Sequence, residues 1–353
     1  MSEPDQAPPA PTPGHPPHRR RVRYAGKNPR RFEDKYKEHH PDRFAGTVAK
    51  VLASGKTPAG THRPIMVAEI LRVLAPRPGE VAVDCTLGHG GHAEQLLRRL
   101  QPGGRLLGVD ADPIELPKTE ARLRTLGFGP ETFTAHRTNF AGLPQVLAEA
   151  GLAGADLVLA DLGVSSMQLD NPARGFSVKD AGPLDMRMNP QRGQPAGAWL
   201  AKIQPAALAR VLVENADEPH ADALAAALAG KQFSTTTALV EAIRRALPRL
   251  SRDETGLTVR RVFQALRIAV NDEFSALSTL LLQLPRLLNP GGRVAVLTFH
   301  SGEDRRVKKA FAAGWQAGDY VEIAQEVLRP GPEERRENPR SSSAKLRWAV
   351  KGA

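Results

Sequence analysis

The chain has 353 residues, with 49 Lys or Arg against 38 Asp or Glu, which gives a formal net charge of +11. A chain of this length can form one large domain or two, and its single cysteine, Cys85, excludes internal disulfide bonds and cysteine-cluster zinc sites. No apolar run approaches the ~20 residues of a membrane-spanning helix, and the N-terminus lacks the apolar stretch of a signal peptide. We therefore expect a cytoplasmic protein. The positive charge favours a polyanionic partner such as RNA or DNA, although an ordinary solvated surface also accounts for it.

Residues 1–60 differ from the rest of the chain. They are proline-rich at first and then basic, with twelve Lys or Arg against six Asp or Glu. Such a segment buries too little apolar surface to offset the entropy of ordering, so we expect it to be largely disordered on its own. One interpretation is a basic arm that lies on phosphate groups, with Tyr24, Phe32 and Tyr36 available for stacking. The alternative is a solubilising tail.

A glycine-rich turn follows the first predicted strand, residues 81–84, and precedes a helix at residues 93–100. It contains Gly88, Gly90 and Gly91. Glycines allow backbone N–H groups to approach a ligand closely, since no Cβ intervenes and positive φ angles cost little. The turn is therefore a candidate site for a nucleotide-like ligand.

The second predicted strand carries Asp110 at its end, 22 residues beyond Gly88. An acidic residue at that place in a strand-helix-strand unit can accept hydrogen bonds from both ribose hydroxyls. The glycine spacing G-x-G-G, however, matches neither the dinucleotide fingerprint nor a P-loop. Three interpretations remain open for the turn: a structural turn, an NAD-type site, and a site for S-adenosylmethionine.

Two further strands, at residues 132–140 and 157–160, continue the alternation with helices. Four such alternations predict a parallel sheet covered by helices on both faces, and ligands of such sheets lie at the carboxyl ends of the strands. Phe140 and Asp161 fall at those ends. Phe140 could pack against an adenine or belong to the ordinary core. Asp161 could meet the cofactor or a substrate amine, or could cap a helix.

The alternation stops after Ser166, and alanine-rich helical patterns predict a helical insert at residues 175–253. A long helix at residues 259–288, interrupted at Pro285, and a fifth strand that ends at Phe299-His300-Ser301 then resume the parallel pattern. The last two strands, YVEIAQEVL and SAKLRWAV, predict a hairpin joined by a Pro/Glu/Arg-rich loop at residues 330–340.

These elements predict an α/β fold of the class I, Rossmann-like type found in S-adenosylmethionine-dependent methyltransferases. Its seven-stranded, mostly parallel sheet takes residues 61–174 and 254–353, the terminal hairpin inserts one antiparallel strand, and the helical insert is expected to recognise the substrate. A double dinucleotide-binding unit lacks such a hairpin, so the cofactor expected is S-adenosylmethionine.

Four segments carry a more specific resemblance: DCTLGHGGH, DLGVSSMQLDNPARGFS with GPLDMRM, VFQALRIAVNDE, and FHSGEDRRVK with NPRSSSAKLR. In matching order over residues 61–350, they resemble the RsmH (MraW) family of bacterial 16S ribosomal RNA (cytosine-N4) methyltransferases. The resemblance implies N4-methylation of one cytidine in the decoding centre of 16S rRNA in the small ribosomal subunit, with S-adenosylmethionine as donor and no metal. The cofactor contacts that it implies fall on Gly90, Gly91, His92, Asp110, Phe140, Asp161 and Gln168.

The chain departs from the family pattern at a few positions. Met167 stands where proline is usual, Gly302 where leucine is usual, and Leu257-Thr258 where a His-Pro pair is usual. None of these falls among the cofactor contacts, but the changes put details of RNA contact in doubt.

Asp161 and His300, at the ends of the fourth and fifth strands, are the candidate catalytic residues, because methylation of an amino nitrogen needs a nearby proton acceptor. His300 could instead be a structural histidine. Asp185, Arg187 and Asn271 are second choices, for which an internal salt bridge or hydrogen bond is an equal alternative. Three rival functions remain open: an NAD-dependent oxidoreductase, a non-catalytic RNA-binding assembly factor, and another nucleic-acid amino-methyltransferase.

Overall fold

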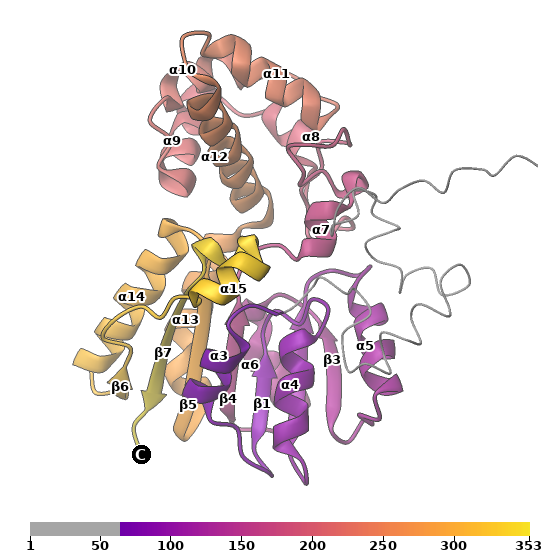
Figure 1. Cartoon of the computed structure of the whole chain (residues 1–353), viewed down its shortest axis with the longest axis vertical. Coiled ribbons are helices and arrows are strands. Elements are labelled where there is room, and N and C mark those ends of the chain that lie inside the picture. The colour runs from indigo at the N-terminus through magenta and orange to yellow at the C-terminus, as the bar shows by residue number, and fades with distance from the viewer. Residues whose placement is uncertain (1–63) are drawn as a thin grey trace, which may run out of the picture.

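The computed structural model describes residues 64–353, so the predictions for residues 1–60 lie outside the described residues. A seven-stranded sheet with the order β3-β2-β1-β4-β5-β7-β6 forms its centre (Figure 1). Strands β1 to β5 run parallel, and β7 pairs antiparallel with both β5 and β6. The predicted sheet, with a terminal hairpin that inserts one antiparallel strand, is confirmed. The strands are β1 (Val81–Asp84), β2 (Arg105–Asp110), β3 (Phe133–Arg137), β4 (Ala155–Asp161), β5 (Leu288–Thr298), β6 (Tyr320–Ile323) and β7 (Lys345–Lys351).

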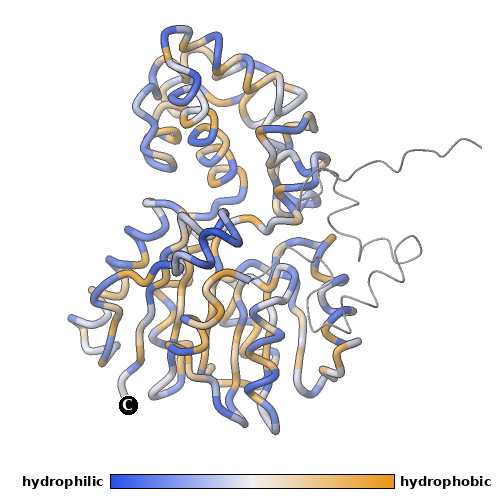
Figure 2. Tube along the Cα trace, in the orientation of Figure 1, coloured by the Kyte–Doolittle hydropathy of each residue, from blue (hydrophilic) through white to orange (hydrophobic). Residues whose placement is uncertain are grey.

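Two helical layers cover the sheet because its central strands are apolar on both faces. In β4, Leu157 and Leu159 face one hydrophobic cluster while Val158 and Ala160 face the other, as the two-residue period of a strand requires. The apolar strands stand out in the lower part of Figure 2. One face packs on α3 (Val67–Leu74), α4 (Gly91–Leu100) and α5 (Leu116–Thr125), and the other on α6 (Leu143–Glu149), α13 (Glu273–Leu287) and α14 (Ser301–Gln316).

The insert has a hydrophobic core of its own, with Leu208, Leu224, Leu239 and Phe263 among its buried side chains. It forms a separate helical layer above the sheet in Figure 1. Five buried side chains of the segment that the sequence assigns to the sheet domain pack in this insert core: Val259, Val262, Phe263, Ala265 and Leu266. Its helices are α7 (Ser166–Asp170), α8 (Ala196–Leu200), α9 (Pro205–Ala216), α10 (Ala221–Leu228), α11 (Thr236–Ala246) and α12 (Arg252–Asn271).

The long helix before β5 breaks at a different place from the one predicted. Asp272, with φ +51°, separates α12 from α13, whereas Pro285 lies inside α13 near its end. The prediction of an interruption at Pro285 is therefore wrong. Pro285 removes one i→i−4 hydrogen bond, but α13 continues for two more residues beyond it. The break at Asp272 marks the passage from the insert to the sheet domain.

The loop predicted at residues 330–340 contains regular structure. A short helix, α15 (Pro332–Glu337), precedes a 3-10 turn at Pro339–Ser343. The segment is tied down at both ends: Glu334 accepts a hydrogen bond from Met66 N–H at 2.8 Å, and Arg340 pairs with Asp170 at 2.6 Å. In Figure 1 α15 lies between the sheet domain and the insert. The C-terminal segment therefore contacts both parts of the protein.

Candidate active site

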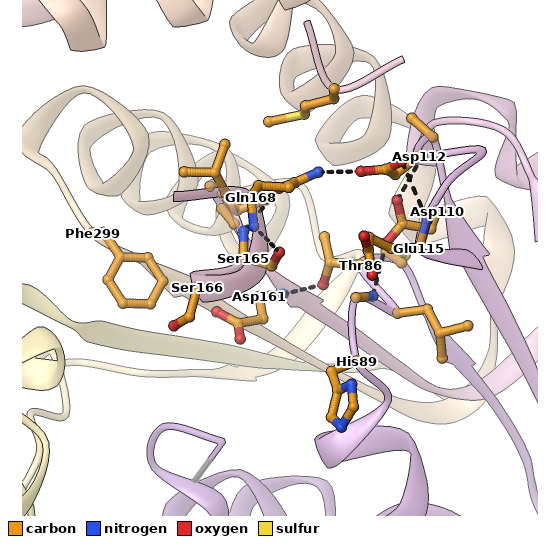
Figure 3. Close-up of a pocket in the computed structure, with 18 of the residues that line it drawn as sticks. Thr86, His89, Asp110, Asp112, Glu115, Asp161, Ser165, Ser166, Gln168 and Phe299 are labelled. Atoms are coloured by element: carbon orange, nitrogen blue, oxygen red, sulfur yellow. Dashed lines mark hydrogen bonds between the residues drawn. The ribbon is translucent and has the colours of Figure 1, made fainter. Parts of the chain in front are cut away.

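A cavity of about 420 Å³ opens at the carboxyl ends of β1, β2, β4 and β5, beneath the insert. Such a position, where the strand order reverses between β1 and β4, is the usual ligand site of a doubly wound sheet. Its walls come from the glycine-rich turn and the ends of β2 and β4 (Figure 3), and also from the α12–α13 junction and the start of α14. The predicted residues Gly90, Gly91, His92, Asp110, Phe140, Asp161 and Gln168 all line this cavity.

The glycine-rich turn is held in place by packing on its outer side. A Cβ on Gly90, whose φ is +75°, would lie 2.9 Å from Thr119 Cγ2, and a Cβ on Gly91 would lie 3.0 Å from Pro64 Cγ. Only glycine fits these two positions without displacing neighbours. The Gly90 N–H donates to the Leu87 carbonyl and closes the turn. Because α4 begins at Gly91, the first N–H groups of that helix have no acceptor within the helix, and they lie at the cavity wall.

Asp110 joins the turn to the end of β2. One of its carboxylate oxygens accepts the Gly88 N–H and the other the Asp112 N–H, each at 2.8 Å. Burial raises the pKa of Asp110 to about 6, against the effect of these two N–H groups. Each oxygen retains one further lone pair, so the carboxylate can accept two more hydrogen bonds from the cavity.

Asp161 ends β4 at the centre of the cavity wall. Its backbone N–H donates to Thr86 Oγ1 at 2.6 Å, and its Oδ2 lies 3.5 Å from Nδ1 of His92. Burial, followed by the charge of Glu303, raises the pKa of Asp161 to about 7. Burial lowers the pKa of His92, and its Nε2 lies 2.9 Å from the Ile65 carbonyl, which requires Nε2–H to donate. The neutral ring therefore turns its Nδ1 lone pair toward Asp161.

Asp112 is a buried carboxylate with several side-chain partners, and the sequence did not predict its role. It accepts a hydrogen bond from Gln168 Nε2 at 2.8 Å and pairs with Arg174 at 2.7 Å, and both charged side chains of that pair are buried. Gln168 Oε1 accepts the Ser165 N–H and completes a capping box at the start of α7. The acidic D-A-D pattern was the only sequence signal, because the partners of Asp112 are distant in the chain.

His300 caps the N-terminus of α14 and is absent from the cavity lining. Its Nε2 lies 3.1 Å from Glu303 Oε1, and its ring packs 5.7 Å from Phe274. Glu303 itself lines the cavity. Burial opposes its ionisation, but the contacts with His300 and Arg267 prevail and hold the pKa of Glu303 below its usual range. His300 therefore affects the cavity indirectly, by its contact with Glu303.

The second-choice residues form contacts within the protein. Arg187 makes a two-pronged pair with Asp185, with both distances 2.7 Å. Asn271 accepts the Met188 N–H at 2.7 Å and donates to the Met186 carbonyl at 2.8 Å. The two hydrogen bonds of Asn271 attach the 183–190 loop to α12. In residues 64–353 there is no cluster of three or more metal-ligating side chains, and no helix there is long and apolar enough to cross a membrane.

A family model described as the MraW methylase family matches residues 59–352 of the chain. The chain belongs to the MraW methylase family. A ribosomal RNA small subunit methyltransferase H 2 of Alkaliphilus metalliredigens is 51% identical over 341 residues, covering 94% of this chain and 97% of that protein. A ribosomal RNA small subunit methyltransferase H 1 of Lachnoclostridium phytofermentans is 48% identical over 345 residues, covering 95% and 94%.

The crystal structure of an S-adenosylmethionine-dependent O-methyltransferase from Thermotoga maritima aligns with 83% of this chain and 68% of that one, with a TM-score of 0.37 and 11% identity. This MraW methylase is an S-adenosylmethionine-dependent methyltransferase, so the oxidoreductase interpretation of the glycine-rich turn is set aside.

Proposed function

We propose that this MraW methylase transfers a methyl group to the exocyclic N4 of one cytidine in the decoding centre of 16S rRNA, in the cytoplasm. The relatives are small-subunit ribosomal RNA methyltransferases by name, and the net charge of +11 suits an RNA substrate. One observation carries the proposal. A carboxylate with a raised pKa, Asp161, lies in the same cavity as the glycine-rich turn and Asp110.

The cofactor fits the end of the cavity formed by β1 and β2. The two free lone pairs of Asp110 match the two ribose hydroxyls, and the open N–H groups at Gly91 and His92 offer donors to the polar tail. Phe140 presents an apolar surface to the adenine, and Gln168 retains one N–H and one lone pair beyond its internal bonds. We propose that these residues, with Gly90 and Asp161, hold S-adenosylmethionine.

The buried carboxylates explain why a cationic cofactor suits this site. Burial raises the pKa of Asp84, like that of Asp110, to about 6, and the pKa of Asp161 to about 7. A positive sulfonium near them offsets the cost of burying their negative charges. When bound, S-adenosylmethionine supplies an electrophilic methyl carbon on that sulfonium.

Asp161 then has two tasks. The cytosine N4 is a poor nucleophile because its lone pair is delocalised into the ring. By accepting an N4–H hydrogen bond, the ionised Asp161 orients the amino group and takes its proton after attack. The His92 Nδ1 lone pair, 3.5 Å away, stabilises the protonated carboxyl. We assign His300 a positioning role, since it holds Glu303 at the cavity wall beside Asp161.

The target base must leave its stack to reach Asp161, at a cost of a few kcal/mol. The insert lies above the sheet in Figure 1, and Met188 on its 183–190 loop lines the cavity. We propose that the insert holds the RNA while the base enters between the two parts of the protein.

The proposal is tested with tritiated S-adenosylmethionine on purified small subunits, naked 16S rRNA and DNA side by side, followed by mapping of the labelled nucleotide. We expect label on one cytosine N4 of the small-subunit RNA and little on DNA. Label on adenine or on DNA would favour another nucleic-acid amino-methyltransferase. RNA binding without transfer would favour an assembly factor.

A further inference from the structure

Arg267, on the last part of α12, lines the cavity together with the strand ends that carry Asp161 and Phe299. Its Nε and Nη2 each donate to a different carboxylate oxygen of Glu273, both at 2.8 Å. Nη2 also lies 4.0 Å from Glu303 Oε1. The guanidinium is thus fixed along one edge, and its plane cannot rotate without breaking this two-pronged pair.

The remaining nitrogen, Nη1, lies close to Gly163, which also lines the cavity. None of the side chains or carbonyls in residues 64–353 accepts a hydrogen bond from it. It lies 3.9 Å from the point where a Cβ on Gly163 would be, and the Phe299 ring lies equally close to that point. Gly163, with φ +99°, comes two residues after Asp161. The missing side chain at Gly163 therefore leaves a space bordered by a cationic donor, an aromatic ring and the end of β4.

The donors and acceptors around this space match one edge of cytosine. Cytosine presents an N4 amino donor beside two acceptors, N3 and O2, whereas uracil presents an O4 acceptor beside an N3–H donor. A carboxylate and a guanidinium therefore complement cytosine and repel the corresponding groups of uracil. Buried polar groups that are left unpaired by the wrong ligand give strong discrimination.

We propose that Arg267 Nη1 donates to the N3–O2 edge of the target cytosine while Asp161 accepts from its N4 amino group and Phe299 stacks on its ring. This inference rests on the proposed N4-methylation and adds the residue that selects cytosine. Glu273 acts through Arg267. Its ion pair fixes the direction of the Arg267 donor before the base arrives, so little side-chain entropy is lost when the base binds.

The test uses the full-length protein with Arg267→Lys, which keeps a positive charge beside Glu273 but lacks the second donor group. A matched control is Arg293→Lys. Arg293 is 13% exposed, compared with 15% for Arg267, and its Nη2 pairs with Glu80 at 2.7 Å outside the cavity lining. Four quantities are measured for each variant: S-adenosylmethionine affinity by calorimetry, the melting temperature, kcat/KM on small subunits, and inhibition of methylation by cytidine and uridine 5′-monophosphates.

We expect wild type and Arg293→Lys to be inhibited more strongly by the cytidine nucleotide than by the uridine nucleotide. Arg267→Lys should lose this preference and 10- to 100-fold of kcat/KM, the range for loss of a base-edge contact, with S-adenosylmethionine affinity unchanged. Full kcat/KM in Arg267→Lys, a retained preference, or an equal loss in Arg293→Lys would overturn the inference. Absence of N4 label with the wild-type enzyme would instead contradict the proposed function itself.

Discussion

Replacing Asp161 by Asn should abolish methylation and at the same time stabilise the fold above neutral pH. The wild-type carboxyl has its pKa raised from 3.8 to about 7, chiefly by burial. Such a rise corresponds to about 4 kcal/mol of unfavourable free energy for the ionised form, as an upper bound. Because the side chain is 28% exposed to the open cavity, we expect about 1–2 kcal/mol of that to be realised.

The sign follows from proton binding. The folded state binds the Asp161 proton more tightly than the unfolded state does, so the stability from this group is complete below about pH 4 and lost as pH rises through about 7. Asp161→Asn escapes this loss. Its free energy of unfolding should equal that of wild type near pH 4 and exceed it at pH 8, measured by urea denaturation at both values.

Asp304→Asn is the control of opposite sign. Although burial opposes ionisation, Arg347 and Lys345 hold the pKa of Asp304 below its usual range. Stability from this group is present above the unfolded pKa and is lost as pH falls through the lower folded value, so the variant should lose stability at pH 8. An Asp161→Asn protein that is less stable than wild type at pH 8, or that retains methylation, would refute this assignment.

Four further outcomes follow from the site. With Asp161 as proton acceptor, kcat/KM should rise about tenfold per pH unit below about 7 and level off above it, and a flat profile from pH 5.5 to 8 would argue for another acceptor. Asp110→Ala should abolish S-adenosylmethionine binding in calorimetry, because it removes the acceptors proposed for the ribose hydroxyls together with the bond that holds Gly88; unchanged affinity would count against that role. Asp112→Ala should lower the free energy of unfolding by about 3–5 kcal/mol, since it leaves Arg174 buried and unpaired, and a change below about 1 kcal/mol in urea denaturation would show that water replaces the lost partner. Removal of residues 1–60 should leave S-adenosylmethionine binding intact, and a large loss of affinity would mean that this segment contributes to the pocket.

The sheet was predictable because its signals are local. Runs such as VAVD and LVLAD carry the apolar residues of a doubly buried strand, and each ends in an aspartate that the parallel topology brings to the same edge. The gathering of Asp110 and Asp161 at one cavity follows from that topology alone. The terminal hairpin was equally visible as two strands at the end of the chain.

The contacts of Asp112 were not predictable from local pattern. Gln168 and Arg174 lie 56 and 62 residues away in sequence, so no periodicity connects them to it. The strand-end argument likewise places the backbone of His300 but not its side chain, which turns back to cap α14 and pair with Glu303. The position of His300 in the sequence therefore predicts that it lies at the edge of the sheet, but the direction of its side chain depends on α14, the helix that follows.

The break at Asp272 and the helix α15 were both missing from the sequence-based prediction, for different reasons. A non-glycine residue in the left-handed region is uncommon and leaves no clear sequence mark. The segment PEERRE, by contrast, has proline at the start, Glu in the first turn and Arg in the last, which are ordinary helix signals. Its surroundings, rich in Pro, Glu and Arg, favoured a loop only by composition.

A crystal of the protein with S-adenosylhomocysteine and a short RNA that carries the mapped cytidine tests the central claim most directly. We predict ribose hydroxyls on Asp110, the cofactor sulfur facing the end of β4, and the cytosine amino group within hydrogen-bond distance of Asp161. A cofactor bound elsewhere on the molecule, with the β1–β2 turn and the β4 end in contact only with water, would contradict the account.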